Sequence, residues 1–292
     1  MAWTSKAASF SAGIAVALFA LLACNPAALP HVPSLPFLAT VWPQGPSNET
    51  NAFICSPQPY ATQIVSTDPL LIYIHDFLSP AEVASLLASG DPLFKPSLTT
   101  KHGRTTRDKS RTSWSAGLPL SDPAVQCVLA RAEAFMGTML APGRDEIGAP
   151  QLVRYSKGQK FDLHFDWYPR PQVSVEDKKR DRKWNRPASF FAVLEDGCEG
   201  GETWFPNVSA VAEQRGGGKE GELWRKHEEG GLAFRPVSGN ALFWVNMRNG
   251  TGDERTKHAG LPVTAGMKTA MNIWPKQYVG KDAWLDEGAD RD

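Results

Sequence analysis

The residues that could carry out chemistry begin with a histidine and an aspartate in the stretch KFDLHFDWYP, residues 160–169. His164 and Asp166 stand among aromatic and apolar residues, and this pattern predicts a β-strand over 161–167. Residues i and i+2 of a strand point to the same face, so the imidazole and the carboxylate would lie side by side. Polar groups in such a protected place need hydrogen-bond partners or a metal ion. An isolated His-x-Asp pair is also a common surface pattern, so the rest of the chain must distinguish the two readings.

A second histidine, His258, precedes an apolar stretch in KHAGLPV. Two imidazoles and one carboxylate form the ligand set of non-haem Fe(II) oxygenases, which leaves three positions of an octahedron open. A zinc hydrolase can use the same ligand types, so this set leaves the metal open. Lys268, ten residues after His258, favours the oxygenase. A buried lysine beside a metal needs an anion, and the carboxylate of a dicarboxylate co-substrate would supply it.

Two helices are expected before the region that holds these residues. Ser79, Pro80 and Glu82 form a helix start signal with a capping box, and Gly90 ends that helix. Asp122 precedes a second helical pattern, which runs to residue 140.

After residue 150, short apolar runs alternate with Gly-, Pro- and charge-rich loops, which is typical of a sheet region. The expected strands cover residues 151–155, 161–167, 189–194, 241–245 and 269–274, with a further candidate at 70–78 before the first helix. The chain of 292 residues is 42% hydrophobic, and its 23 prolines and 10 tryptophans favour a loop-rich β architecture. Its formal net charge of zero argues against a nucleic-acid partner, and nothing in the pattern fixes an oligomeric state.

The chain is expected to have four parts. Residues 1–24 contain an apolar run that predicts a signal peptide or a signal anchor, and LLAC within it resembles a lipoprotein cleavage box. Residues 25–66 are rich in Pro, Ser, Asn and Thr and are interpreted as a linker or stalk. Residues 67–278 form the catalytic domain, and residues 279–292 a polar C-terminal tail.

The secretory pathway is the expected location. Three Asn-x-Ser/Thr sequons, at Asn48, Asn207 and Asn249, are candidate glycosylation sites. An oxidising lumen would permit one disulfide among the three cysteines that follow Cys24, with one left free. The absence of a Cys-x-x-Cys pair from the sequence argues against a zinc–thiolate site. We therefore expect an endoplasmic reticulum membrane protein with a lumenal catalytic domain, bound to the membrane by the N-terminal segment if it is uncleaved. The alternative is a secreted protein.

Four segments in fixed order resemble the prolyl 4-hydroxylase family of 2-oxoglutarate/Fe(II)-dependent dioxygenases, and within that family its fungal members. The segments are LVRYSKGQKFDLHFD, NRPASFFAVLEDGCEGGETWFP, PVSGNALFWVN and HAGLPVTAGMKTAMNIW. The resemblance implies a mainly β fold with N-terminal helices and a double-stranded β-helix, or jelly-roll, core.

Residue by residue, the resemblance implies an iron site, a co-substrate site and a substrate side. The Fe(II) ligands and catalytic residues are His164, Asp166 and His258. The residues around 2-oxoglutarate are Lys268, which pairs with its C5 carboxylate, Tyr155 and Thr203. The substrate-side candidates are Arg186, Phe161 and Trp274.

The activity that the resemblance implies is hydroxylation of an unactivated C–H bond, foremost in a proline residue of a peptide. It consumes O2 and 2-oxoglutarate, with L-ascorbate as an expected reductant. Phe161 stands where the family often has tyrosine, and Lys276 where some members have histidine. These departures keep a second interpretation open, the same chemistry on a small metabolite or a biosynthetic peptide of fungal natural-product biosynthesis. A third interpretation is a non-catalytic jelly-roll binding module, against which the complete ligand set with Lys268 argues.

Overall fold

One large sheet with buried residues on both faces organises the fold. The computed structural model describes residues 53–101, 104–174, 182–211 and 222–284 of the chain. All of these lie within the compact unit Asn51–Asp292. The large sheet has nine strands, in the order β1-β2-β17-β12-β21-β8-β6-β3, with β13 pairing with β21. Their bounds are β1 Ala61–Thr67, β2 Leu70–His75, β3 Lys95–Pro96, β6 Trp114–Gly117, β8 Gln151–Ser156, β12 Ala188–Glu195, β13 Cys198–Gly200, β17 Ala241–Val245 and β21 Val263–Ile273.

The second layer is a five-stranded sheet in the order β15-β16-β14-β20-β9. Its strands are β9 Phe161–His164, β14 Thr203–Phe205, β15 Trp224–Lys226, β16 Leu232–Phe234 and β20 His258–Gly260. A four-stranded sheet, β10-β11-β22-β7, comprises β7 Glu146–Ile147, β10 Gln172–Val173, β11 Lys183–Asn185 and β22 Pro275–Val279. Two hairpins complete the strands, β4 Thr99–Lys101 with β5 Arg104–Thr106 and β18 Met247–Arg248 with β19 Thr251–Gly252.

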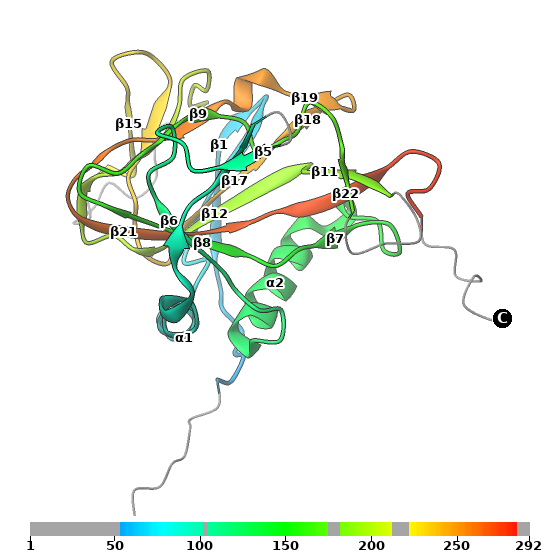
Figure 1. Ribbon diagram of the computed structural model, residues 1–292, viewed down its shortest axis with the longest axis horizontal. Coiled ribbons are helices and arrows are strands. Elements are labelled where there is room, and N and C mark those ends of the chain that lie inside the picture. The colour runs from blue at the N-terminus through cyan, green and yellow to red at the C-terminus, as the bar shows by residue number, and fades with distance from the viewer. Residues whose placement is uncertain (1–52, 102–103, 175–181, 212–221, 285–292) are drawn as a thin grey trace, which may run out of the picture. The chain divides into compact units, whose positions relative to one another are not determined.

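Helices cover the opposite face of the large sheet. They are α1 Pro80–Gly90 and α2 Pro123–Met136, and short 3₁₀ turns occur at Asp91–Leu93, Gly137–Met139 and Glu254–Thr256. Figure 1 shows α1 and α2 below the large sheet and β9 and β15 above it. The central strand β12 is buried along almost its whole length because both of its faces are covered. Phe190 packs in the core shared with the helices, and Phe191 in the core shared with the five-stranded sheet. The predicted mainly β, jelly-roll fold with N-terminal helices is confirmed.

Local chemistry accounts for both helix starts. The Ser79 hydroxyl accepts a hydrogen bond from the Glu82 amide at 3.2 Å, and the Glu82 carboxylate accepts one from the Ser79 amide at 2.8 Å. Asp122 caps α2 by accepting from the amides of the second and third helical residues. The second helix ends at Met136, earlier than predicted, because Gly137 adopts a φ of 51° and a 3₁₀ turn follows.

Three predicted boundaries are corrected by the structure. Residues 61–66, assigned to the linker, belong to β1, which pairs with β2 and contributes Val65 to the core. The strand predicted over 161–167 ends at His164. The predicted tail starts inside β22, and the carbonyl of the buried Ala283 accepts a hydrogen bond from Arg182 at 2.8 Å.

A disulfide joins Cys55 to Cys127 on α2, and Cys198 is free and half-buried. The sequence left three pairings of these cysteines open, and the tertiary structure selects this one. Within the described ranges no helix has the length and apolarity needed to cross a membrane. The predicted signal segment 1–24, most of the predicted linker and the sequon at Asn48 lie outside the described residues.

Candidate active site

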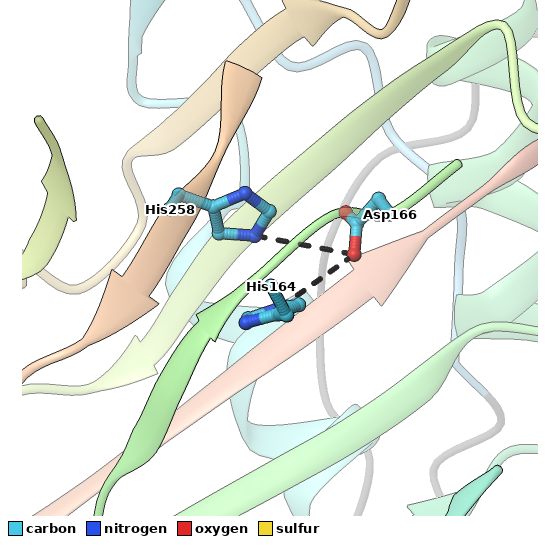
Figure 2. A group of neighbouring side chains, drawn as sticks. All are labelled: His164, Asp166 and His258. Atoms are coloured by element: carbon cyan, nitrogen blue, oxygen red, sulfur yellow. Dashed lines mark ion pairs between the residues drawn. The ribbon is translucent and has the colours of Figure 1, made fainter. Parts of the chain in front are cut away.

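The three predicted metal ligands converge at one end of the five-stranded sheet. Antiparallel pairing of β20 with β9 places His258 directly opposite His164, with ring centroids 4.3 Å apart. Asp166 Oδ1 lies 3.8 Å from His164 Nε2 and 3.9 Å from His258 Nε2 (Figure 2). These separations exceed hydrogen-bond distance. All three candidate ligand atoms lie within 4.8 Å of one another, an arrangement that could hold a metal ion.

The way in which Asp166 reaches this cluster differs from the prediction. Because β9 ends at His164, strand alternation does not place the carboxylate, and Asp166 belongs to the bend that follows. Tertiary contacts place it instead. Its Oδ2 accepts hydrogen bonds from the Ser189 hydroxyl at 2.6 Å and the Trp274 indole at 3.0 Å, and its main-chain carbonyl accepts from Arg186 Nη1 at 3.2 Å. These contacts leave Oδ1 directed at the imidazoles.

Main-chain carbonyls orient both imidazole rings. His164 Nδ1 lies 2.8 Å from the carbonyl of Asp162, and His258 Nδ1 lies 3.0 Å from that of Thr256. A carbonyl oxygen can only accept, so each Nδ1 donates to its carbonyl, and Nε2 is the ring nitrogen that faces Asp166 and could bind a metal. Histidines that bind a metal commonly donate from their other ring nitrogen to a carbonyl or carboxylate in this way.

Burial and charge prepare the cluster for a cation. Desolvation, reinforced by the neighbouring His258, lowers the pKa of His164 to about 3, so its imidazole is neutral at physiological pH. Burial alone would raise the pKa of Asp166, but His258 and His164, with the donors Arg186 and Ser189, lower it to about 2. The ionised Asp166 carboxylate and the neutral His164 imidazole are thus in the protonation states in which these groups bind Fe(II), and His258 supplies the second imidazole.

Lys268 lines the same pocket and is 2% exposed. Its ammonium donates to the Gly201 carbonyl at 2.6 Å and lies 3.5 Å from the Thr203 hydroxyl. Desolvation lowers the pKa of Lys268 to about 8, against the opposing effect of Cys198 and Glu202. No carboxylate lies in hydrogen-bond contact with this ammonium among the described residues, so it remains available to an anionic ligand.

A glycine turn makes the contact with Lys268 possible. Gly200 and Gly201 have φ values of 70° and 67°, in the left-handed region that favours glycine. A Cβ on Gly200 would meet the Pro262 carbonyl at 2.6 Å, and one on Gly201 would approach the Lys268 stem to 3.5 Å. The turn thereby directs the Gly201 carbonyl at the ammonium.

Tyr155 and Thr203 also line this pocket, as predicted for co-substrate-side residues. Tyr155 is the cross-strand partner of Lys268 in the β8–β21 pair, and its ring centroid lies 5.9 Å from the ammonium. Burial raises the pKa of Tyr155, so its phenol stays neutral and can donate a hydrogen bond. A wider surface hollow along residues 208–211 and 222–232 contains none of the candidate ligands.

The predicted substrate-side residues take different places. Phe161 and Trp274 line the pocket, and the Phe161 ring stacks on His164 with a centroid separation of 3.6 Å. Arg186 lies behind Trp274, with its guanidinium carbon 3.7 Å from the indole centroid. Arg186 therefore supports Trp274 and Asp166, and Trp274 is itself a donor to the carboxylate. A direct substrate role for any of the three stays a prediction.

Besides Gly260, four residues whose side chains line the pocket were missed by the sequence analysis: Arg111, Phe191, Trp244 and Asn272. Asn272 could have been found, because it lies on the same face of β21 as Lys268 at an even spacing. The other three come from separate segments and carry no local signal. The Arg111 guanidinium carbon lies 4.9 Å from the Phe161 ring centroid, and burial lowers the pKa of this arginine.

Lys276 and the two described sequons lie elsewhere. Lys276, noted as a departure from the family, forms an ion pair of 2.9 Å with Glu146 on β7. Asn207 is exposed in the turn after β14. Asn249 is exposed in the tight turn between β18 and β19, where Asn249 and Gly250 both have positive φ. Glycosylation at either sequon stays a prediction.

The chain is similar to proteins described as Fe(II) oxygenases and prolyl hydroxylases. Residues 150–276 match the profile described as the 2OG-Fe(II) oxygenase superfamily. Prolyl 4-hydroxylase 1 of Arabidopsis thaliana is 29% identical over 221 residues, which cover 74% of this chain and 71% of that protein. Prolyl 4-hydroxylase subunit alpha-3 of Homo sapiens is 28% identical over 231 residues, 78% of this chain but 37% of that subunit. Among solved structures, the viral collagen prolyl hydroxylase of Paramecium Bursaria Chlorella virus-1, a 2OG complex, gives a TM-score of 0.48 at 18% identity over 77% of this chain and 99% of that one.

Proposed function

Because the chain carries a 2OG-Fe(II) oxygenase domain with prolyl 4-hydroxylase homologues, we propose that it hydroxylates a proline residue in a peptide. One observation carries the proposal: a single pocket holds both the His164, Asp166 and His258 ligand atoms and the buried Lys268 ammonium. This is the pair of recognition elements that a metal-chelating dicarboxylate requires. A zinc hydrolase has no use for the second element.

The residues of the pocket have three proposed roles: metal binding, co-substrate binding and exclusion of water. His164, Asp166 and His258 would hold Fe(II), which when bound supplies O2 activation coupled to the oxidative decarboxylation of 2-oxoglutarate. Lys268 pairs with the far carboxylate of the co-substrate, and Tyr155 and Thr203 offer hydroxyl groups beside it. Phe191 and Trp244 give this part of the pocket an apolar wall that excludes water.

The proposed substrate side is the pocket wall formed by Phe161, Trp274 and Arg111. Aromatic faces suit the ring of a proline, and the names of the plant and human relatives support this substrate. A second candidate is the same reaction on a small metabolite or biosynthetic peptide, as expected for a fungal-type member. The observation that favours it is the apolar Phe161, which cannot hydrogen-bond a peptide main chain through its side chain.

The proposal also includes a secretory location, with the catalytic domain in the endoplasmic reticulum lumen, and L-ascorbate as the reductant. The Cys55–Cys127 disulfide supports an oxidising compartment, and the exposure of Asn207 and Asn249 makes both sequons accessible to glycosylation. An endoglycosidase shift of the protein expressed in a eukaryotic cell tests the location. Unshifted, cytosolic protein would contradict it.

The activity is tested with purified protein, Fe(II), ascorbate and 2-oxoglutarate, by measuring succinate in the presence of proline-rich peptides and, separately, of small molecules. We expect succinate release stimulated by a peptide that gains the mass of one oxygen atom. Product on a small molecule alone would move the substrate assignment to the second candidate. Iron-loaded protein that releases no succinate under any of these conditions would contradict an oxygenase.

A further inference from the structure

Behind the metal-binding carboxylate lies a second hydrogen bond that continues into the core. Ser189 on β12, which donates to Asp166 Oδ2 at 2.6 Å, is fully buried. Its hydroxyl oxygen accepts from Asn246 Nδ2 at 2.9 Å, and Asn246 is also fully buried, directly after β17. Pairing of Ser189 with Trp244 across β12 and β17 fixes the approach of the two segments. Two core residues are thus connected in series to one candidate iron ligand.

The chain of hydrogen bonds has a direction. A serine hydroxyl has one hydrogen, and the ionised Asp166 can only accept. If Asn246 presented its amide oxygen to Ser189, two acceptors would compete for that one hydrogen. With Nδ2 as the donor, Asn246 occupies a lone pair of the Ser189 oxygen and leaves the hydroxyl hydrogen for Asp166. Main-chain bonds of 2.8 Å on both sides of Asn246, to Pro187 and from Asp253, hold it in place.

The amide of Asn246 is not explained by packing alone. Its Oδ1 is buried with no hydrogen-bond partner among the described residues. An unpaired buried amide oxygen is destabilising, and an apolar side chain of the same size would avoid it. What the amide provides in return is the donor to Ser189.

We propose that Ser189 and Asn246 are positioning residues that fix the Asp166 carboxylate for metal binding. They hold Oδ2 in the core, beside the Trp274 donor, so that Oδ1 alone faces His164 and His258. The proposal deepens the proposed function and rests on metal binding by these three residues. Mutation of a residue that hydrogen-bonds a metal ligand typically lowers metal affinity by about 10–100-fold.

The test is a titration with Co(II), which does not require turnover and gives bound-metal absorption bands that report ligand geometry. Wild type is compared with Ser189→Ala, Asn246→Leu and the double variant. We expect Ser189→Ala to weaken Co(II) binding by about 10–100-fold and Asn246→Leu by about tenfold. Because the two residues act in series, the double variant should bind no more weakly than Ser189→Ala. Leucine fills the volume of the amide, and thermal melting verifies that each variant is folded.

Asn240→Leu is the matched control. Asn240 immediately precedes the other end of β17, is 8% exposed, and bonds to Tyr73 and to the Asp76 amide, away from the ligands. Its substitution should lower the melting temperature and leave the Co(II) affinity and spectrum unchanged.

The outcomes separate the two proposals. If the wild-type protein does not bind Co(II), both the proposed function and the positioning role of Ser189 and Asn246 are overturned. If the wild-type protein binds Co(II) and Ser189→Ala binds it with unchanged affinity, only the positioning role is overturned. If the losses of Co(II) affinity multiply in the double variant, Asn246 acts independently of Ser189, which also overturns the positioning role in series.

Discussion

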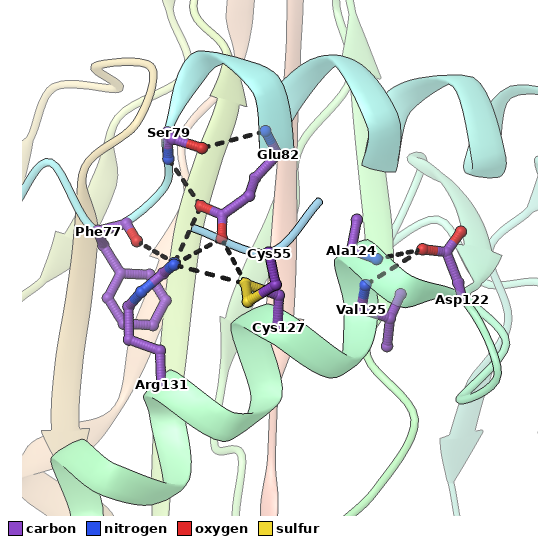
Figure 3. Close-up of a disulfide and its surroundings, with 9 residues drawn as sticks. All are labelled: Cys55, Phe77, Ser79, Glu82, Asp122, Ala124, Val125, Cys127 and Arg131. Atoms are coloured by element: carbon purple, nitrogen blue, oxygen red, sulfur yellow. Dashed lines mark hydrogen bonds and ion pairs between the residues drawn. A yellow bond between two sulfur atoms is a disulfide. The ribbon is translucent and has the colours of Figure 1, made fainter. Parts of the chain in front are cut away.

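Asp166 and Glu82 are both buried carboxylates, 5% and 1% exposed, in opposite kinds of surroundings. Glu82 Oε2 accepts from the Ser79 amide at 2.8 Å and from Arg131 Nη1 at 3.0 Å, while Oε1 accepts from Arg131 Nη2 at 2.5 Å (Figure 3). Its charge is balanced by one guanidinium, beside the Cys55–Cys127 disulfide. In Asp166, Oδ2 accepts two hydrogen bonds, and Oδ1 faces two imidazole nitrogens beyond hydrogen-bond distance.

The difference separates a structural carboxylate from a binding one. Both oxygens of Glu82 have donors, and its charge is paired with Arg131, so this side chain connects α1 to α2. In Asp166 one oxygen is held by donors, and the other faces the Nε2 atoms of two imidazoles. A buried charge persists only when it is compensated, and a cation beside Oδ1 would add to the compensation that Ser189, Trp274 and Arg186 already give Asp166.

The largest effect is expected from removing the oxygen that faces the imidazoles. Asp166→Ala, like His164→Ala or His258→Ala, should reduce succinate release to background and abolish Co(II) binding, while the far-ultraviolet circular dichroism spectrum stays native. The physical reason is that two remaining ligands cannot hold the ion in a fixed geometry. The matched control is Asp162→Ala, whose half-exposed side chain pairs with Lys160 while its main-chain carbonyl still orients His164. Near-wild-type turnover in any of the three ligand variants would remove that residue from the site.

The converse change should affect stability without affecting binding. Glu82→Ala leaves the Arg131 guanidinium, which is 9% exposed, without its partner. Breaking one half of a buried pair lowers the free energy of unfolding by about 3–5 kcal/mol, measured by denaturant titration. The Co(II) affinity of the folded fraction should not change. Replacing both partners, as Glu82→Leu with Arg131→Met, should restore most of the lost stability. A loss of metal affinity in Glu82→Ala would mean that the two regions are coupled.

Lys268 extends the comparison to a buried cation. Lys268→Ala removes the charge partner of the co-substrate, which costs about 2–5 kcal/mol when the pair is buried. This corresponds to roughly 30-fold to a few thousand-fold in 2-oxoglutarate affinity, measured as the co-substrate dependence of succinate release beside the iron content. Arginine should rescue poorly, because its planar fork is wider than the lysine head group. Retained iron with unchanged 2-oxoglutarate dependence would make this lysine a bystander.

The smallest expected effect is on pH dependence. With a pKa of about 8, the Lys268 ammonium is present below pH 8 and is lost as the pH rises through that value. The affinity for 2-oxoglutarate should therefore fall by about tenfold per pH unit above pH 8, until the higher pKa of the lysine in the complex is reached. In Lys268→Ala this part of the pH dependence should disappear. The same slope in wild type and Lys268→Ala would assign it to another group.

The sequence predicted the ligands because their chemistry is encoded in short, fixed spacings. His164, Asp166 and Lys268 each stand in a segment with its own pattern, and the starts of both helices follow from local caps. The prediction that strand alternation places Asp166 in the site was wrong. Long-range packing sets where β9 ends, and it brings the Ser189 and Trp274 donors to the carboxylate. No spacing rule connects Asp166 to residues 23 and 108 positions away.

The disulfide and the pocket wall show the same limit. Any two of Cys55, Cys127 and Cys198 could have paired on composition alone, and the docking of the segment before β1 against α2 decides the pairing. Trp244 reaches the pocket through sheet order, in which strands distant in sequence become neighbours, and Arg111 through an isolated bridge to Phe161. Residues of this kind become visible only once the topology is known.

The pairing of β9 with β20 has a consequence for the integrity of the sheet. β9 is the edge strand of the five-stranded sheet, and segment 110–112 covers its outer side through the bonds from Asp162 to Ser110 and from Thr112 to Lys160. An ion shared by His164 and His258 would fasten this edge to its neighbour. Local opening that exposes the β9 and β20 amides would then require the ion to leave. Metal binding should therefore slow amide hydrogen exchange more in these two strands than in the rest of the protein. Loss of iron would make the separation of β9 from β20 easier, and a separated strand edge can associate with other chains.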